Sequence, residues 1–203
     1  MYVLNDHNSY VSRCDNSYFC IMELKQKAIC IYGASSSRIA ETYMDDAFAV
    51  GELIARNGYA LVSGGGRGGL MASAIDGALS AGGEAIGVLP EFMIEKEWHH
   101  LSLTRMITCP DMHTRKRTMA EMSSGVIALP GGVGTLDELM EIITWRQLSL
   151  YKGNIVILNT NGFYDPLFEM LDRIARQRFM RPSRKKLWSV ATTPEEAVEA
   201  ATK

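Results

Sequence analysis

The stretch ALPGGVGTLDELMEIITW, residues 128–145, combines glycines and acidic side chains in a way that suits chemistry. It contains Gly131, Gly132 and Gly134, whereas a tight turn needs one glycine and a helix start needs only a cap. Glycines let the backbone approach a ligand closely, and free amides at the start of the following helix attract an anion. The stretch therefore predicts a phosphate-binding loop with an acidic residue, Glu138, just beyond it.

Thr135 and Glu138 leave a purely structural alternative open, because they stand at the T-x-x-E spacing of a capping box. Capping accounts for these two residues but not for the glycines before them. Asp137 precedes Glu138 and faces about 100° away from it on a helix, so we do not expect a paired acid/base couple. One acid beside one arginine is the more economical site.

The segment CPDMHTRKRTMAEMSSG, residues 109–125, supplies the candidate arginine. Asp111 is placed to cap a short helix, and Arg115 then falls within the first two turns, where a cation opposes the helix dipole. Arg115 shares its helical face with Met119 and Met122, and an arginine on a partly apolar face needs an anionic partner. We therefore expect Arg115 to face an anion.

Short apolar runs and helical patterns alternate along the chain. The runs are nearly continuously apolar, as expected for strands covered on both faces, and lie at 27–33, 58–64, 84–90, 125–131, 154–160 and 187–191. Helical patterns lie near 38–57, 67–82, 112–123, 135–150, 164–179 and 194–202. This alternation predicts an α/β fold: a doubly wound parallel sheet in three α/β/α layers, forming a single domain.

Ligands of such sheets bind at the carboxyl ends of the strands, where three loops of small residues follow predicted strands. These loops read GASSS (33–37), SGGGRGGLM (63–71) and PGGVGT (130–135). Each alone has a local explanation, but their position on one edge of one sheet favours a shared phosphate-containing ligand, with Ser35, Gly65 and Gly66 as further contacts. The P-loop motif is missing, which disfavours hydrolysis of a nucleoside triphosphate. A G-x-G-x-x-G after the first strand is also missing, which disfavours a dinucleotide cofactor.

Composition excludes several function classes. Hydrophobic residues make up 47% of the chain and the net charge is −2, so no global basic field points to nucleic acid. No apolar run reaches membrane-spanning length, and no cluster of residues has the spacing of metal ligands. Cys14, Cys20, Cys30 and Cys109 are scattered, with Cys30 inside a predicted strand, which is typical of reduced thiols in a cytoplasmic protein.

Residues 1–24 are polar, lack periodicity and precede the first predicted strand. We expect them to form a flexible N-terminal extension to a domain spanning residues 25–203. They have no basic n-region and no continuous apolar h-region, so we do not expect them to act as a signal peptide. Met22 opens MELKQKAICIYG, which has the character of a natural start and favours the hypothesis that residues 1–21 are a start-site artefact.

At these motifs the sequence resembles the Lonely Guy (LOG) family of cytokinin-activating phosphoribohydrolases. PGGVGTLDE (130–138) matches the family signature P-G-G-x-G-T-x-x-E without a break, and DMHTRK (111–116) resembles its companion arginine motif. The likeness extends over roughly residues 26–200 and includes GGGRGGLM (64–71) and NGFYDPL (161–167).

The resemblance implies a Rossmann-like subunit, usually a homodimer, that splits a nucleoside 5′-monophosphate into a free base and ribose 5-phosphate. The substrate would be AMP or an N6-substituted adenine nucleotide. No metal or organic cofactor is implied. The residues that match the family pattern are Arg115 and Glu138 as the catalytic pair, and Lys116, Gly131, Gly132, Val133, Gly134 and Thr135 as substrate-binding residues.

Two positions fit the family pattern less well. Glu97 aligns with a substrate-contacting acid, but the loop EFMIEKEWHH (91–100) is longer and more charged than expected, so Glu95 competes for that role. Arg67, inside the second glycine loop, is not a position carried over from the family.

The expected chemistry suits these residues, because cleavage of a ribosyl bond passes through an oxocarbenium-like transition state that a carboxylate stabilises. Many relatives carry the label lysine decarboxylase, but nothing here singles out a Schiff-base lysine for pyridoxal phosphate. The alternative from another class is a nucleotide- or molybdenum-cofactor-binding carrier on the same fold. Simple binding would not require Arg115 and Glu138 together.

Overall fold

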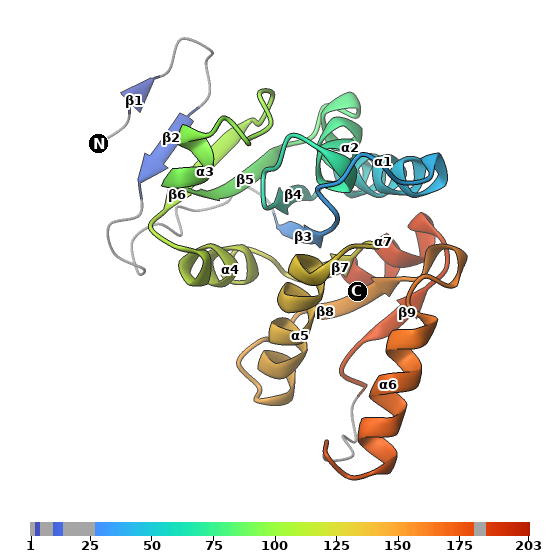
Figure 1. Cartoon of the computed structure of the whole chain (residues 1–203). Coiled ribbons are helices and arrows are strands. Elements are labelled where there is room, and N and C mark those ends of the chain that lie inside the picture. The colour runs from blue at the N-terminus through green and yellow to red at the C-terminus, as the bar shows by residue number, and fades with distance from the viewer. Residues whose placement is uncertain (1–2, 5–9, 14–26, 181–185) are drawn as a thin grey trace.

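The computed structural model describes residues 3–4, 10–13, 27–180 and 186–203 of the chain, and shows one sheet covered by helices on both faces (Figure 1). Its strands are β1 (Val3–Leu4), β2 (Tyr10–Arg13), β3 (Ala28–Tyr32), β4 (Ala60–Ser63), β5 (Ala85–Pro90), β6 (Arg105–Cys109), β7 (Gly125–Ala128), β8 (Asn154–Leu158) and β9 (Ser189–Ala191). Its α-helices are α1 (Glu41–Arg56), α2 (Gly69–Ser80), α3 (Glu91–Glu95), α4 (Met112–Glu121), α5 (Val133–Gln147), α6 (Asp165–Arg176) and α7 (Pro194–Thr202).

The sheet is doubly wound, as the sequence predicts. Its strand order is β1-β2-β6-β5-β4-β3-β7-β8-β9, and β3 to β9 are all parallel to their neighbours. The chain runs outward from β3 through β4, β5 and β6, and then returns to the other side of β3 with β7. The switch point in strand order therefore lies between β3 and β7, where ligands of open α/β sheets bind.

Alternate residues of the central strand face two separate hydrophobic cores. Cys30 and Tyr32 of β3 pack in one core with side chains of α4 and α5, whereas Ile29 and Ile31 pack in the other with side chains of α1, α2 and α7. This period of two, with both faces covered, explains why the strands read as continuously apolar runs. The result is the predicted three-layer α/β/α arrangement.

The six predicted strands and six predicted helices are all present, with ends shifted by a few residues. Five described elements were missed: β1 and β2 in the predicted extension, the short 3₁₀ helix Thr160–Gly162, β6 and α3. Strand β6 reads RMITC, in which Arg105 and Thr108 interrupt the apolar run. Helix α3 has only five residues, too few for a helical period to show in the sequence.

The predicted extension, residues 1–24, lies mostly outside the described residues. Its described parts are β1 and β2, which pair antiparallel with each other, while β2 pairs parallel with β6. The remaining residues of the extension, including Cys14, Cys20 and Met22, lie outside the described ranges.

Two glycines allow α1 and α2 to pack backbone to backbone. A Cβ at Gly51 of α1 would overlap with the carbonyl oxygen of Ala74, and a Cβ at Gly77 of α2 would overlap with that of Phe48. Both obstacles are backbone atoms, so a side chain at either position would force the helices apart.

We expect Gly51→Ala to lower the free energy of unfolding by about 1–3 kcal/mol, because it overpacks a contact that cannot yield locally. Gly134→Ala is the matched control, since a Cβ there meets nothing within 4 Å and Gly134 lies in the first turn of α5. Urea unfolding followed by circular dichroism measures both. Equal stability of the two variants would contradict this account of the α1–α2 contact.

Candidate active site

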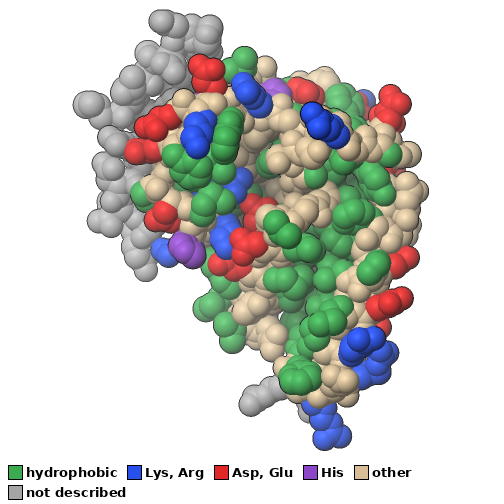
Figure 2. Space-filling view, viewed as in Figure 1, with side chains coloured by type: hydrophobic (Ala, Val, Ile, Leu, Met, Phe, Trp, Pro, Cys, Tyr) green, Lys and Arg blue, Asp and Glu red, His purple; other side chains and the backbone are tan. Residues whose placement is uncertain are grey.

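A cavity of about 900 Å³ opens at the carboxyl ends of the strands, at the switch point of the sheet. Its walls come from the loops after β3, β4 and β7, together with Arg115 of α4 and Glu138 of α5. Figure 2 shows the surface hollowed where these elements meet. The three small-residue loops predicted to share an edge therefore line one cavity.

The helix after the third loop begins earlier than the capping-box alternative requires. Gly132 is the N-cap of α5 and Val133 is its first residue, so Thr135 lies inside the first turn. The carboxylate of Glu138 accepts a hydrogen bond from Arg115. The capping-box interpretation of Thr135 and Glu138 is therefore wrong.

The start of α5 is arranged to receive an anion. First-turn N–H groups of a helix have no acceptor within the helix, and here they belong to Val133, Gly134 and Thr135, which line the cavity. A Cβ at Gly132 or Gly134 would meet no described atom within 4 Å, so these glycines border open space. The loop leaves room for a ligand against its backbone.

Gly131 of the same loop has no side chain for a different reason, which is close packing within the protein. A Cβ at this position would overlap with the side chain of Thr135, so Gly131 lets the loop close over the first turn of α5. None of the three glycines of this loop has a positive φ; they provide space rather than an unusual backbone conformation.

The glycines of the second loop serve packing instead. A Cβ at Gly64 would overlap with the guanidinium of Arg115, so this glycine makes room for the arginine. Gly69 has φ 62° and lies against the carbonyl oxygen of Ala34, where a Cβ would overlap. The loop after β3 also takes up the first amides of α2, because Gly69 donates to Ser37 Oγ at 3.0 Å and Leu70 donates to Ala34 O at 2.8 Å. The N-terminus of α5 is therefore the better seat for an anion.

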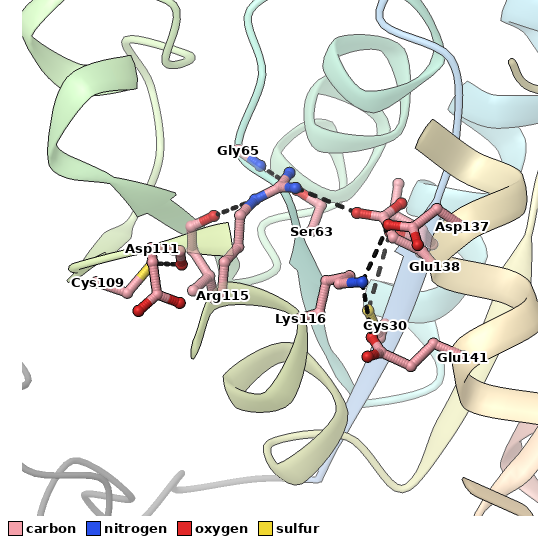
Figure 3. A network of polar contacts seen from close by, with 12 residues as sticks. Cys30, Ser63, Gly65, Cys109, Asp111, Arg115, Lys116, Asp137, Glu138 and Glu141 are labelled. Carbon is pink, nitrogen blue, oxygen red and sulfur yellow. Dashed lines mark hydrogen bonds and ion pairs between the residues drawn. The ribbon is translucent and has the colours of Figure 1, made fainter. Parts of the chain in front are cut away.

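Arg115 is held in a fixed position between three elements (Figure 3). Asp111 caps α4 as predicted, accepting from the N–H of Thr114 at 2.7 Å. From this helix Arg115 donates through Nε to the carbonyl oxygen of Val88 in β5 at 3.0 Å and through Nη1 to Glu138 Oε1 at 3.2 Å. The side chains of Arg115 and Glu138 are only 7% and 12% exposed, so the predicted anionic partner of Arg115 is Glu138 itself.

Glu138 has an acidity suited to proton transfer near neutral pH. Burial raises the pKa of its carboxyl from the ordinary 4.5 to about 7, and the nearby charges of Asp137 and Glu141 act in the same direction. Arg115 and Lys116 lower the pKa but do not cancel the effect of burial. A carboxyl with a strongly perturbed pKa that lines a cavity is typical of a functional group.

The structure brings most predicted site residues to the cavity. Those that line it are Ser35, Gly66, Arg115, Gly132, Val133, Gly134, Thr135 and Glu138. Gly65 and Gly131 lie beside the lining residues and shape the loops. Gly65 has φ 66° and its N–H donates to Ser63 Oγ at 3.1 Å.

Lys116 and Glu97 are not among the residues that line the cavity. Lys116 Nζ lies 3.0 Å from Asp137 Oδ2 and 3.1 Å from Glu141 Oε2. Glu97 is exposed, has φ 55°, and donates its N–H to Ile94 O in the turn that ends α3. Its competitor Glu95, in α3, is exposed as well.

Sequence reasoning missed an apolar wall and a cation. Met71, Met93 and Trp98 line the cavity, and so does Arg67. The segment that carries Trp98 is fixed to the second glycine loop, because the Arg67 N–H donates to Trp98 O at 2.9 Å and the His100 N–H donates to Gly65 O at 2.8 Å. The positions of these side chains depend on how separate loops approach one another in the fold, which the sequence does not reveal. The glycines around Arg67 were the one sequence feature that pointed to a loop at the cavity.

Neither a metal site nor a membrane-spanning helix is found in the part of the chain that the structure describes. Within the described ranges, no group of three or more His, Cys, Asp or Glu side chains is placed to hold a metal ion. Among the helices of the described chain, none is long and apolar enough to cross a membrane. Cys30 and Cys109 are both free and buried.

The chain is similar to a protein family and to several known proteins over most of its length. A family model described as "Possible lysine decarboxylase" matches residues 71–201. A cytokinin riboside 5′-monophosphate phosphoribohydrolase of Rhodococcoides fascians is 37% identical over 175 residues, which cover 86% of this chain and 88% of that protein. The Arabidopsis thaliana cytokinin riboside 5′-monophosphate phosphoribohydrolase LOG1 is 36% identical over 179 residues, or 88% of this chain and 84% of that protein.

Solved structures share the fold. A molybdenum cofactor carrier protein of Chlamydomonas reinhardtii matches with a TM-score of 0.66 and 26% identity, over 88% of this chain and 97% of that chain. A molybdenum cofactor binding protein of Rippkaea orientalis matches with the same TM-score at 24% identity, over 87% and 96% of the two chains.

The raised pKa of Glu138 predicts a pH dependence of stability. Between pH 4.5 and about 7 the folded protein keeps a proton that the unfolded chain releases, so stability falls as pH rises through this range. Glu138→Gln lacks this titration. We expect the unfolding free energy of the native protein, relative to this variant, to fall by about 2–3 kcal/mol between pH 4.5 and 8. Denaturant unfolding of both proteins across this range measures it, and a constant or rising difference would refute the assignment.

Proposed function

Since this chain belongs to the LOG family, we propose that it hydrolyses the N-glycosidic bond of an adenine or N6-substituted adenine nucleoside 5′-monophosphate. The products are the free base and ribose 5-phosphate. Similarity to phosphoribohydrolases over 86–88% of the chain supports this activity. The observation that carries it is the buried pair of Arg115 and Glu138 beside the free amides of α5.

The 5′-phosphate binds at the N-terminus of α5, where Val133, Gly134 and Thr135 carry first-turn amides and line the cavity. Binding energy at this end of the substrate positions the ribose over Glu138. The base extends toward the apolar wall of Met71 and Trp98. Each part of the nucleotide thus meets a wall of matching chemistry.

In the reaction the bond between C1′ and the base nitrogen breaks, and the bonding electron pair leaves with the base. Positive charge develops on C1′ and the ring oxygen, and the carboxylate of Glu138 stabilises it. Water adds its hydroxyl to C1′ and gives its proton to the Glu138 carboxylate, which releases it to solvent, while the departing base takes up a proton from solvent, so atoms and charge balance. With a pKa of about 7, Glu138 is substantially ionised at neutral pH and remains basic enough to accept a proton from the water.

Arg115 fixes this geometry. Its guanidinium is held by the Val88 carbonyl and by Glu138, so it orients the carboxylate and presents its remaining N–H donors to substrate oxygens. In this proposal, neither the cleavage of the glycosidic bond nor the addition of water uses a metal or an organic cofactor.

A non-catalytic carrier of a nucleotide or molybdenum cofactor is the second candidate. The observation that favours it is the fold shared with the Chlamydomonas reinhardtii carrier, at 26% identity. A carrier does not require a buried carboxyl whose pKa is raised toward neutrality beside an arginine, and fold alone does not decide function.

Membership of the family also supports a proposal about assembly and location. We propose a homodimer in the cytoplasm, free of nucleic acid. Large apolar side chains are exposed at Leu148, Leu150, Phe163, Met170 and Phe179, and Figure 2 shows hydrophobic side chains gathered over the part of the surface formed by α5 and α6. Such a surface fits a second copy of the chain. The buried free thiols fit a reducing compartment.

Incubation with AMP and with isopentenyladenosine monophosphate, followed by chromatography of the free base, tests the activity. We expect Glu138→Gln and Arg115→Ala to lower the rate of base release by about 10²–10⁴-fold, because each removes a group that acts on the transition state. Glu199→Gln, on the exposed surface of α7, is the matched control and keeps the native rate.

Tight nucleotide binding without release of base would favour the carrier and reject the enzyme. Release of inorganic phosphate in place of base would indicate a phosphatase and overturn the mechanism.

Gly64 gives a second test, of the position of Arg115. We expect Gly64→Ala to lower kcat by about 100-fold while the fold persists, because the new Cβ displaces only the end of the flexible arginine side chain. In an Arg115→Ala background the same change should cost little further activity, since the displaced group is gone. Kinetics of the single and double variants measure this. Additive losses would show that Gly64 acts independently of Arg115.

A further inference from the structure

We propose that Lys116 is a positioning residue that fixes α4 against α5 through Asp137 and Glu141, and so holds Glu138 in place without contacting the substrate. This inference rests on the proposed function, in which Glu138 is the catalytic carboxylate. It replaces the substrate-binding role that family resemblance implies for Lys116.

The side chain of Lys116 is directed at α5. Figure 3 shows its amine aimed at the carboxylates of Asp137 and Glu141, and the two distances are 3.0 and 3.1 Å. The Lys116 side chain is only 10% exposed, and Lys116 is not among the residues that line the cavity. An amine held by two carboxylates at these distances has two of its three donors committed.

The two carboxylates enclose the turn that carries Glu138. Asp137 and Glu141 are four residues apart and lie on one side of α5, with Glu138 between them in sequence. Two consecutive residues of α4 therefore bind α5: Arg115 holds Glu138, and Lys116 holds the residues on either side. Rotation of α5 about its axis, or sliding along α4, would break at least one of these contacts.

Lys116 also offsets the negative charge around Glu138. The charges that act on Glu138 are the carboxylates of Asp137 and Glu141 on α5 and the cations Arg115 and Lys116 on α4.

From β3 it meets Cys30 and Tyr32, whose own pKa values are raised by burial and by the charge of Glu138, so both stay neutral. Burial opposes the charge on Lys116, but the hydrogen bonds to Asp137 and Glu141 outweigh it and raise the lysine pKa. Loss of the lysine would leave two uncompensated carboxylates next to Glu138.

The test compares Lys116→Met, which removes the charge at similar length, with Lys116→Arg, which retains it. Lys203→Met, an exposed lysine at the end of the chain, is the matched control. Two readouts are needed: an NMR titration of the Glu138 carboxyl carbon in the free protein, and the pH profiles of kcat and KM with AMP.

For Lys116→Met we expect the pKa of Glu138 to rise by about one unit, the acid limb of kcat to move with it, and KM to change less than about threefold. At high pH, where Glu138 is ionised in both proteins, kcat stays about tenfold below native because the helix contact is lost. Lys116→Arg should remain within about threefold of native in both parameters.

A rise in KM of about tenfold or more with an unmoved Glu138 titration would show that Lys116 binds substrate and overturn the inference. Full recovery of kcat at high pH would reduce the role to charge alone and also overturn it.

If Lys116→Met fails to fold, Asp137→Asn and Glu141→Gln carry the test. Each removes one contact and one negative charge, so the Glu138 pKa should fall while kcat at high pH drops; unchanged values in both would reject the proposal. The titration needs no turnover, so absence of base release from the native protein would reject the proposed function and leave this inference to be judged by the NMR readout.

Discussion

The ion pair between Arg115 and Glu138 is the interaction on which the rest of the site depends. Both side chains are largely withdrawn from water, and removal of one partner from such a pair commonly costs about 3–5 kcal/mol because the other charge stays buried. Three separate features position this pair. Asp111 caps α4, the Val88 carbonyl accepts a hydrogen bond from Arg115, and the missing side chain at Gly64 leaves room for the guanidinium. The pair joins two helices on one face of the sheet, and both of its members line the cavity.

The glycines of the three loops have different structural roles. The loops after β3 and β4 pack against each other and around Arg115, so their small residues serve close approach within the protein. Of the three loops, only the one after β7 has glycines beside open space. The first residues of α5 line the cavity, whereas the amides of Gly69 and Leu70 in α2 already donate to the loop after β3. In the proposed function, a phosphate bound at the start of α5 would lie about one helical turn from Glu138, so a single rigid helix would connect the phosphate site with the catalytic carboxylate.

Much of this was readable from the sequence. Continuous apolar runs predicted the six principal strands. Because a charged Arg115 on a partly apolar helix face needs compensation, the sequence also predicted its anionic partner. Strand β6 was hidden by Arg105 and Thr108, while α3 was too short to show a period. The direction of Lys116 and the wall formed by Trp98 could not be predicted, because they depend on how separate loops and helices approach one another in three dimensions. The capping-box alternative failed because α5 starts two residues before Thr135, which spacing alone does not reveal.

A crystal structure of the Glu138→Gln variant with AMP would show whether α5 binds the phosphate and brings the ribose to position 138, since the slowed variant retains the nucleotide. We expect the 5′-phosphate within about 3.5 Å of the amides of Val133, Gly134 or Thr135, with C1′ of the ribose facing the side chain at position 138. A phosphate seated instead on the loop of residues 33–37 or on Arg67, with C1′ remote from position 138, would contradict it.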